Sequence, residues 1–341
     1  MMTTMKKGVL LVNLGTPDNP NYGGVFRYLN QFLTDGRVID IPWLPRQILV
    51  RGIIAPFRSK SSSNIYKKLW TEDGSPIKVY GYKVQEEVQR ILGKEYHVEL
   101  AMRYQNPSIE SAVAKLKAAF VDEIIVFPMF PHYASASTGS AMEEVMRVLS
   151  KEQMIWPLKM INSYYDNPEM IQVFADNARK HDLDKMDHVL FSFHGVPQRH
   201  MRKADPTKKW CQKKENCCST MCDANKFCYS AQCHQTAHLI AAELGLAKDQ
   251  YTICYQSRLG KDPWMQPYTT DTLKERAAAG DKNMLVFSAA FVADCLETTV
   301  EISDEYQEEW EEMGGEHLYL VESLNDNPRW INAVAEMVKN V

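Results

Sequence analysis

The stretch Gly8-Val9-Leu10-Leu11-Val12-Asn13-Leu14, followed by Gly15-Thr16-Pro17, indicates the class of fold to which this chain belongs. Its β-branched and aliphatic residues predict a strand, and the glycine and proline predict the turn that ends it. The pattern occurs again at residues 189–193, which run into His194-Gly195-Val196-Pro197. Two such strand–turn–helix beginnings predict two similar α/β halves, with a boundary near residues 150–165.

Short apolar segments alternate with segments of helical periodicity along the chain. This alternation predicts parallel sheets with helices on both faces, in two doubly wound, Rossmann-like halves with right-handed crossovers. The predicted strands are residues 8–14, 97–102, 123–129, 159–161, 187–193, 251–255, 283–287 and 317–321. We expect an N-terminal half over residues 1–155, a C-terminal half over residues 156–325, and a last helix over residues 326–341 that packs back on the N-terminal half.

The composition excludes several classes of protein. With 39 basic and 43 acidic residues the chain has a formal net charge of −4, which gives no overall attraction to nucleic acid. No G-x-G-x-x-G or G-x-x-x-x-G-K-[ST] motif indicates a dinucleotide or a nucleoside triphosphate. No apolar run is long enough for a bilayer span or a signal-peptide core, so we expect a cytoplasmic protein.

Two features indicate acid–base or metal chemistry. His194 falls at the end of a predicted strand, where its neutral imidazole can accept a proton or bind a metal ion. Residues 294–312 contain nine acidic and no basic residues, and Glu297, Glu301 and Glu305 recur every four positions. This spacing predicts one helical face, which a wider helical turn would align better. Because the preceding residues 284–292 are apolar, the stripe should begin near the interior, where carboxylates suit a divalent cation or transferred protons.

Six of the eight cysteines lie between Cys211 and Cys233. In a cytoplasmic chain such clustering favours a metal site over disulfides. The pairs of C-x2-C knuckles typical of zinc are absent, so the spacing favours an iron–sulfur cluster. The alternative is a zinc loop that binds nucleic acid through the lysines around it, but the acidic net charge argues against that function.

Together these residues resemble the ferrochelatase family, whose members insert Fe2+ into protoporphyrin IX to form protohaem with release of two protons. The match includes Ser192-Phe193-His194-Gly195-Val196-Pro197 and extends over nearly the whole chain. The other matching segments are residues 13–17, 73–76, 102–104, 131–139, 256–260, 263–264, 294–298 and 322–325. The resemblance implies a lyase with a porphyrin cleft between its two halves. A chelatase for another metal or tetrapyrrole is the alternative.

The resemblance also implies the roles of individual residues. His194 and Glu297 would be the catalytic residues and the ligands of the substrate Fe2+, and Glu301 and Glu305 would continue a path for protons or metal. The residues that would bind the porphyrin are Tyr66, Ser75, Arg103, Tyr104 and Trp264. Some members carry histidine at the position of Cys295, which puts a ligand role for this position in doubt.

The loop over residues 200–232 resembles the internal cysteine-rich segment by which certain members hold a 2Fe–2S cluster. The implied ligands are Cys211, Cys218, Cys222 and Cys228, with Cys217 as the substitute for Cys218. Residues 41–60 place apolar side chains between arginines, a pattern that can lie on a membrane surface, and they resemble the mouth of the porphyrin cleft. From its pattern alone this segment is also consistent with an ordinary core helix.

Overall fold

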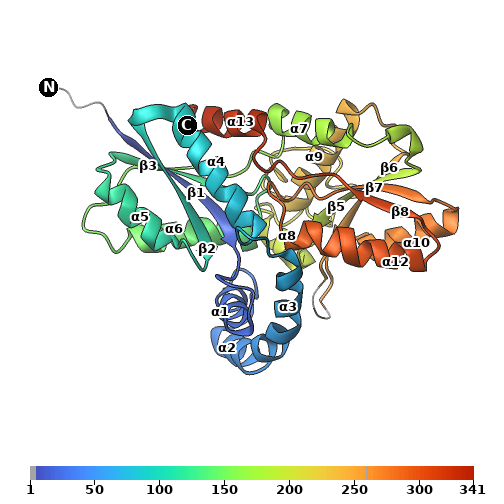
Figure 1. Cartoon of the computed structure of the whole chain (residues 1–341), viewed down its shortest axis with the longest axis horizontal. Coiled ribbons are helices and arrows are strands. Elements are labelled where there is room, and N and C mark those ends of the chain that lie inside the picture. Colours follow the sequence, from blue (N-terminus) through green and yellow to red (C-terminus); the bar gives the residue numbers. More distant parts are fainter. Residues whose placement is uncertain (1–4, 259, 261) are drawn as a thin grey trace. The chain divides into compact units, whose positions relative to one another are not determined.

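The computed structural model describes residues 5–258, 260 and 262–341. It contains two four-stranded parallel sheets, with strand orders β2-β1-β3-β4 and β6-β5-β7-β8 (Figure 1). The predicted α/β fold with two similar halves is therefore confirmed. Contacts group the described chain into two compact units. One runs to Phe130 and includes Ala134–Ser163 and Asn325–Val341, and the other consists of Pro131–Tyr133 and Tyr164–Leu324. The predicted division at residues 155 and 325 stays a prediction, and its first four residues lie outside the described chain.

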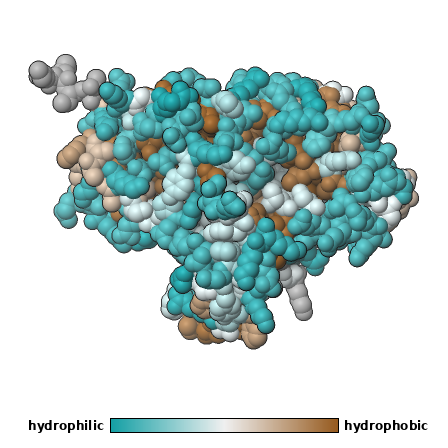
Figure 2. Space-filling model, in the orientation of Figure 1, coloured by the Kyte–Doolittle hydropathy of each residue, from teal (hydrophilic) through white to brown (hydrophobic). Residues whose placement is uncertain are grey.

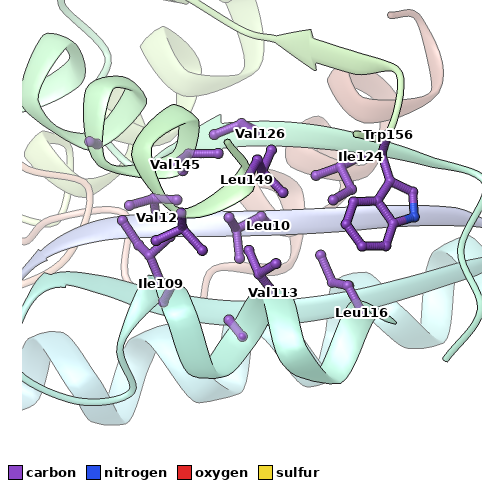
Figure 3. Close-up of a cluster of buried hydrophobic side chains, with 14 of the residues drawn as sticks. Leu10, Val12, Ile109, Val113, Leu116, Ile124, Val126, Val145, Leu149 and Trp156 are labelled. Carbon is purple, nitrogen blue, oxygen red and sulfur yellow. The ribbon is translucent and has the colours of Figure 1, made fainter. Parts of the chain in front are cut away.

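The first unit is built around strand β1 (Lys7–Gly15), which pairs with β2 (Tyr96–Tyr104) and β3 (Glu123–Pro128). Side chains alternate between the two faces of this strand. Leu10 and Val12 pack against helices α5 (Ile109–Ala118) and α6 (Ser140–Leu149) in one buried cluster (Figure 3). On the opposite face, Leu11 is paired in register with Leu100, whose side chain lies against Gly81 of α4 (Pro76–Leu92). Both faces of the central strand are therefore covered.

The remaining elements of the first unit extend this arrangement. They are α1 (Tyr22–Leu33), α2 (Trp43–Leu49), η1 (Val50–Ile54), α3 (Ala55–Leu69), α4 (Pro76–Leu92), η2 (Gly93–Glu95), η3 (Ser135–Gly139), β4 (Leu158–Met160) and α13 (Pro328–Lys339). Helices α1, α2 and α3, which lie between β1 and α4 in the sequence, form a projection (Figure 1). Strand β1 ends at Gly15, where φ is +114° and a Cβ would lie 2.1 Å from the Tyr104 carbonyl oxygen, so only glycine fits.

The second unit repeats this plan around β5 (His188–His194), which pairs with β6 (Tyr251–Gln256) and β7 (Asn283–Phe287). Leu190 packs with Trp310 and Ile302 on one face, while Phe191 stacks on Phe287 at 4.7 Å between ring centres on the other. The other elements are α7 (Pro168–Ala178), η4 (Leu183–Lys185), α8 (Gln198–Ala204), α9 (Tyr229–Glu243), α10 (Thr269–Ala279), α11 (Leu296–Thr299), η5 (Glu301–Tyr306), α12 (Gln307–Glu312) and β8 (His317–Leu320). Within the described residues, no helix combines the length and the apolar character that a membrane span requires.

Candidate active site

His194 is the last residue of β5, and three contacts fix its place. Its backbone oxygen accepts a 2.8 Å hydrogen bond from the Tyr229 hydroxyl, and its ring lies 6.3 Å from that of Phe291. Its Nδ1 is 2.7 Å from the Gly195 carbonyl oxygen. A carbonyl can only accept, so this contact assigns the proton of the neutral ring to Nδ1. The Nε2 lone pair is then the one that can take a proton or a metal ion.

Trp264 is joined to the turn that follows His194. Pro197 and Trp264 form an isolated bridge, and the Met265 backbone N–H donates to the Val196 carbonyl at 3.1 Å. A Cβ on Gly195 would lie 3.4 Å from the Trp264 ring and 2.9 Å from the Gln256 carbonyl oxygen, so the turn needs a residue without a side chain. The structure thus brings predicted residues His194 and Trp264 to the same edge of the second sheet.

The acidic stripe begins inside this unit and leads outward. Glu297 lies in α11 and Glu301 opens the π-helical segment η5, which is the wider turn that the four-residue spacing favours. The Glu305 backbone N–H donates to the Val300 carbonyl, five residues back, at 3.0 Å. Glu297 and Glu301 are partly buried, whereas Glu305 is exposed. The carboxylates therefore form a line from the interior towards solvent.

Glu301 has the most strongly perturbed carboxyl group of this stripe. Its Oε2 accepts hydrogen bonds from Ser257 Oγ at 2.8 Å and from Gln256 Nε2 at 3.3 Å. Burial and the neighbouring charge of Glu297 outweigh these donors and raise the pKa of Glu301 to about 7. Glu301 can therefore gain or lose a proton near neutral pH.

Gln256 and Ser257 contact the site, although no individual role is predicted for either residue from the sequence. The amide of Gln256 donates to the Glu297 carbonyl at 3.0 Å, and Gln256 is the register partner of His194. Ser257 has φ of +66°, which is unusual for a residue with a side chain. Their signals in the sequence are that they follow the predicted strand over residues 251–255 and begin the matching segment over residues 256–260. Leu259 of the same matched segment lies outside the described residues.

The other predicted porphyrin-binding residues belong to the first unit. Arg103 Nη2 and the Tyr104 hydroxyl donate to the Asp35 carboxylate at 2.7 and 2.9 Å. Burial alone would raise the pKa of Asp35, but hydrogen bonds from Ser140 and Arg37 and the charge of Arg103 lower it overall. Arg103 keeps some exposure, whereas Tyr104, Tyr66 and Ser75 are buried. Arg103 is thus the member of this group that a ligand can reach most directly.

The cysteine-rich loop brings thiols together in pairs. Cys211 and Cys218 each make a side-chain hydrogen bond to Cys228, and the sulfur atoms of Cys217 and Cys218 are 3.8 Å apart. Asp205 shapes the loop by accepting from the backbone N–H groups of Trp210 and Cys211, each at 2.9 Å.

Cys222 makes no hydrogen bond to another thiol within the described residues, and its backbone N–H donates to Asn225 Oδ1 at 2.7 Å. In the part of the chain that the structure describes, no group of three or more histidine, cysteine or acidic side chains is arranged to hold a single metal ion.

The chain is similar over nearly its whole length to known proteins. A family model described as ferrochelatase matches residues 6–341. The ferrochelatase of Legionella pneumophila (strain Lens) is 44% identical over 334 residues, which are 98% of this chain and 99% of that protein. The ferrochelatase of Coxiella burnetii (strain Dugway 5J108-111) is 43% identical over 336 residues, 98% of this chain and 93% of that protein.

Among solved structures, SirB from Bacillus subtilis with Fe3+ superposes with a TM-score of 0.54 at 11% identity, over 98% of this chain and 95% of that one. So low an identity supports the fold alone. The near-complete sequence matches decide the family, as the resemblance implied: the chain belongs to the ferrochelatase family.

Proposed function

We propose that His194 and Glu297 carry the chemistry by which this protein inserts Fe2+ into protoporphyrin IX and forms protohaem. The reaction replaces two pyrrole protons by the metal ion and changes no oxidation state, so it needs a proton acceptor and a path for cations. The observation that carries the proposal is the Nδ1 contact to the Gly195 carbonyl, which leaves Nε2 of His194 as the acceptor. The same contact stabilises the imidazolium that forms, because its Nδ1–H keeps a partner.

The cation would be attracted, and the protons transferred, by the carboxylates of Glu297, Glu301 and Glu305. A carboxylate that is partly withdrawn from water attracts Fe2+ and can accept a proton that leaves the site. Glu301 suits a relay, because its pKa of about 7 allows it to hold or release a proton at little free-energy cost. The exposed Glu305 would exchange with solvent. We propose that this stripe is the path along which protons, metal or both move.

The proposed porphyrin-binding residues are Trp264 in the second unit and Arg103, Tyr66, Ser75 and Tyr104 in the first. Trp264 Nε1 is buried and has no hydrogen-bond partner among the described residues, so this donor is not committed to another protein group. A flat tetrapyrrole keeps its nitrogen lone pairs in the ring plane. Rigid contacts around the ring that bend it would expose those lone pairs to the metal, and binding energy from the rest of the macrocycle would offset the strain.

We also propose that the cysteine-rich loop holds a 2Fe–2S cluster. Such a cluster takes four cysteine thiolates, two at each iron, and the loop supplies thiols in adjacent pairs. The contacts favour Cys211, Cys217, Cys218 and Cys228 over a set that includes Cys222. Between residues 199 and 226 there are eight basic and three acidic residues. Their excess positive charge would offset the negative charge of a cluster held by four thiolates. Iron insertion transfers no electron, so the cluster would stabilise the loop or sense its surroundings.

We further propose that the part of the projection made by α2, η1 and α3 contacts an anionic membrane surface. A poorly soluble porphyrin could enter the protein from that surface. Large apolar side chains are exposed there and gather at the tip of the projection (Figure 2). They are Trp43, Leu44, Ile48, Ile53 and Phe57. Between residues 41 and 71 there are six basic and no acidic residues, a charge that complements anionic lipid.

Replacement of His194 tests the assignment of the proton acceptor. Purified protein mixed with Fe2+ and protoporphyrin without oxygen should develop haem absorbance. We expect His194→Ala to lower kcat by about 100-fold or more, since a positioned general base contributes a factor of that order. Porphyrin binding, followed by fluorescence, should persist. His317→Ala, at an exposed histidine of the same unit, is the control. Substantial remaining activity in His194→Ala would contradict the assignment.

The raised pKa of Glu301 predicts how stability depends on pH. A carboxyl group whose folded-state pKa lies above its unfolded value of 4.5 costs stability as pH rises from 4.5 through about 7. Glu301→Gln removes this cost. We therefore expect the variant to gain up to about 3 kcal/mol more stability at pH 8 than at pH 5. Chemical denaturation at both values measures this, with Glu308→Gln at an exposed position as the control. Equal gains at the two pH values would show that Glu301 titrates normally.

The visible spectrum of anaerobically purified protein tests the cluster. We expect about two iron and two sulfide ions per chain, as a 2Fe–2S cluster requires. Cys217→Ala should abolish the absorbance, and Cys222→Ala should retain it, since of these two residues Cys217 is the one whose sulfur lies beside that of Cys218. Stoichiometric zinc without sulfide would overturn the cluster. Loss in Cys222→Ala with retention in Cys217→Ala would restore Cys222 as the fourth ligand.

Sedimentation with lipid vesicles tests the membrane contact. The protein should bind vesicles that contain anionic lipid and bind neutral ones more weakly, because basic residues near a surface add about 1 kcal/mol each. Ile53→Ser combined with Phe57→Ser should weaken binding to both. Phe120→Ser, at an 86% exposed position elsewhere in the same unit, is the matched control. Equal binding by the double variant and the control would exclude this surface.

A further inference from the structure

Gln256 is a buried residue at the end of β6 that is bonded to both sides of the candidate site. Its exposed fraction is 2%, and β-sheet register places it opposite His194. Its backbone oxygen accepts a 2.8 Å hydrogen bond from the Gly195 N–H. Gln256 is therefore bound through its main chain to the turn that follows the candidate proton acceptor.

Both polar atoms of the Gln256 side chain are hydrogen-bonded. Its Oε1 accepts from Ser192 Oγ at 2.8 Å, which orients the amide. One N–H then donates to the Glu297 carbonyl at 3.0 Å and the other to Glu301 Oε2 at 3.3 Å. An amide with three partners in a buried place has one orientation in which all are satisfied. Gln256 thus joins β5 to the segment that carries the acidic stripe.

The next residue adds an independent contact. Ser257 holds a φ of +66°, and its Oγ donates to Glu301 Oε2 at 2.8 Å. A left-handed conformation costs a residue with a side chain about 1 kcal/mol or more, so surrounding contacts must maintain it. The residue with this unusual backbone conformation, Ser257, is thus hydrogen-bonded to Glu301 of the acidic stripe.

We propose that Gln256 is a positioning residue that holds the junction of α11 and η5, and with it Glu297 and Glu301, at a fixed place relative to His194. The inference rests on the proposed function, because it takes the roles of His194 and Glu297 from there. The backbone carbonyl of Glu297 accepts a hydrogen bond from this amide, and the α-helical part of the segment, α11, is four residues long. α11 continues through Val300 into η5, so the amide holds the point at which the α-helical turn passes into the π-helical one. Misplacement by about 1 Å can cost a reaction about 100-fold.

Replacement by methionine tests the inference, because methionine has a similar length and shape without the amide. Gln89→Met is a matched control in the other unit. Gln89 also accepts one backbone hydrogen bond, from Val98, and donates two, to Gly93 and Tyr96. Gln256→Glu is the second variant, since it can still accept from Ser192 but, when ionised, cannot donate to Glu297 and repels Glu301.

Two measurements are made on each variant of the full chain. The first is kcat for Fe2+ insertion together with porphyrin binding in the absence of metal. We expect Gln256→Met to lower kcat about 10- to 100-fold with porphyrin binding within about twofold of the unaltered protein, and Gln256→Glu to lower kcat further. The second is amide hydrogen exchange. Residues 296–306 should exchange about tenfold faster in Gln256→Met than in Gln89→Met.

Two results would overturn the inference. One is a kcat for Gln256→Met within about twofold of that of Gln89→Met, which is too small for the loss of a buried hydrogen bond. The other is unchanged exchange over residues 296–306, which would show that the junction holds its place without the amide. If the unaltered protein formed no haem, the proposed function would fail. The exchange measurement would still decide whether Gln256 holds the segment.

Discussion

Burial of the central strand of each sheet on both faces is the constraint on which the rest of this structure depends. Strand β1 lies between the α4 side and the α5–α6 side, and β5 carries packed side chains on both faces in the same way. A strand covered in this manner can present side chains to a ligand only at its ends. In parallel sheets the carboxyl ends of all strands meet at one edge. His194 at the end of β5 and Gln256 at the end of β6 lie there for that reason.

Residues whose signal is local could be predicted from the sequence. The strand from Gly8, the repeat that ends at His194 and the four-residue spacing of Glu297, Glu301 and Glu305 all appear as short-range patterns. The structure contains the corresponding strands and an acidic segment with a π-helical turn. The spacing of residues predicts which side chains share a face of a helix. The acidic stripe could therefore be predicted without knowledge of any tertiary contact.

Residues whose role depends on a distant partner could not be predicted. Gln256 is a neutral amide 41 positions from Glu297, and Asp35 lies 68 positions from the Arg103 that it pairs with. Neither has a neighbouring charge or spacing that marks it. The choice between Cys217 and Cys222 has the same origin, because it depends on how the loop folds around Asp205 rather than on the number of residues between cysteines.

The two units show how differently a protein can treat a carboxylate that it withdraws from water. Asp35 accepts from Arg103 and Tyr104, and these partners keep it ionised. Glu301 lies among other carboxylates, and its pKa rises. If Fe2+ approaches Glu297, its charge lowers the pKa of Glu301, so the arrival of the metal favours release of the proton that Glu301 holds. In the proposed function the acidic stripe would thereby couple the entry of a cation to the departure of protons, which is the exchange that metal insertion requires.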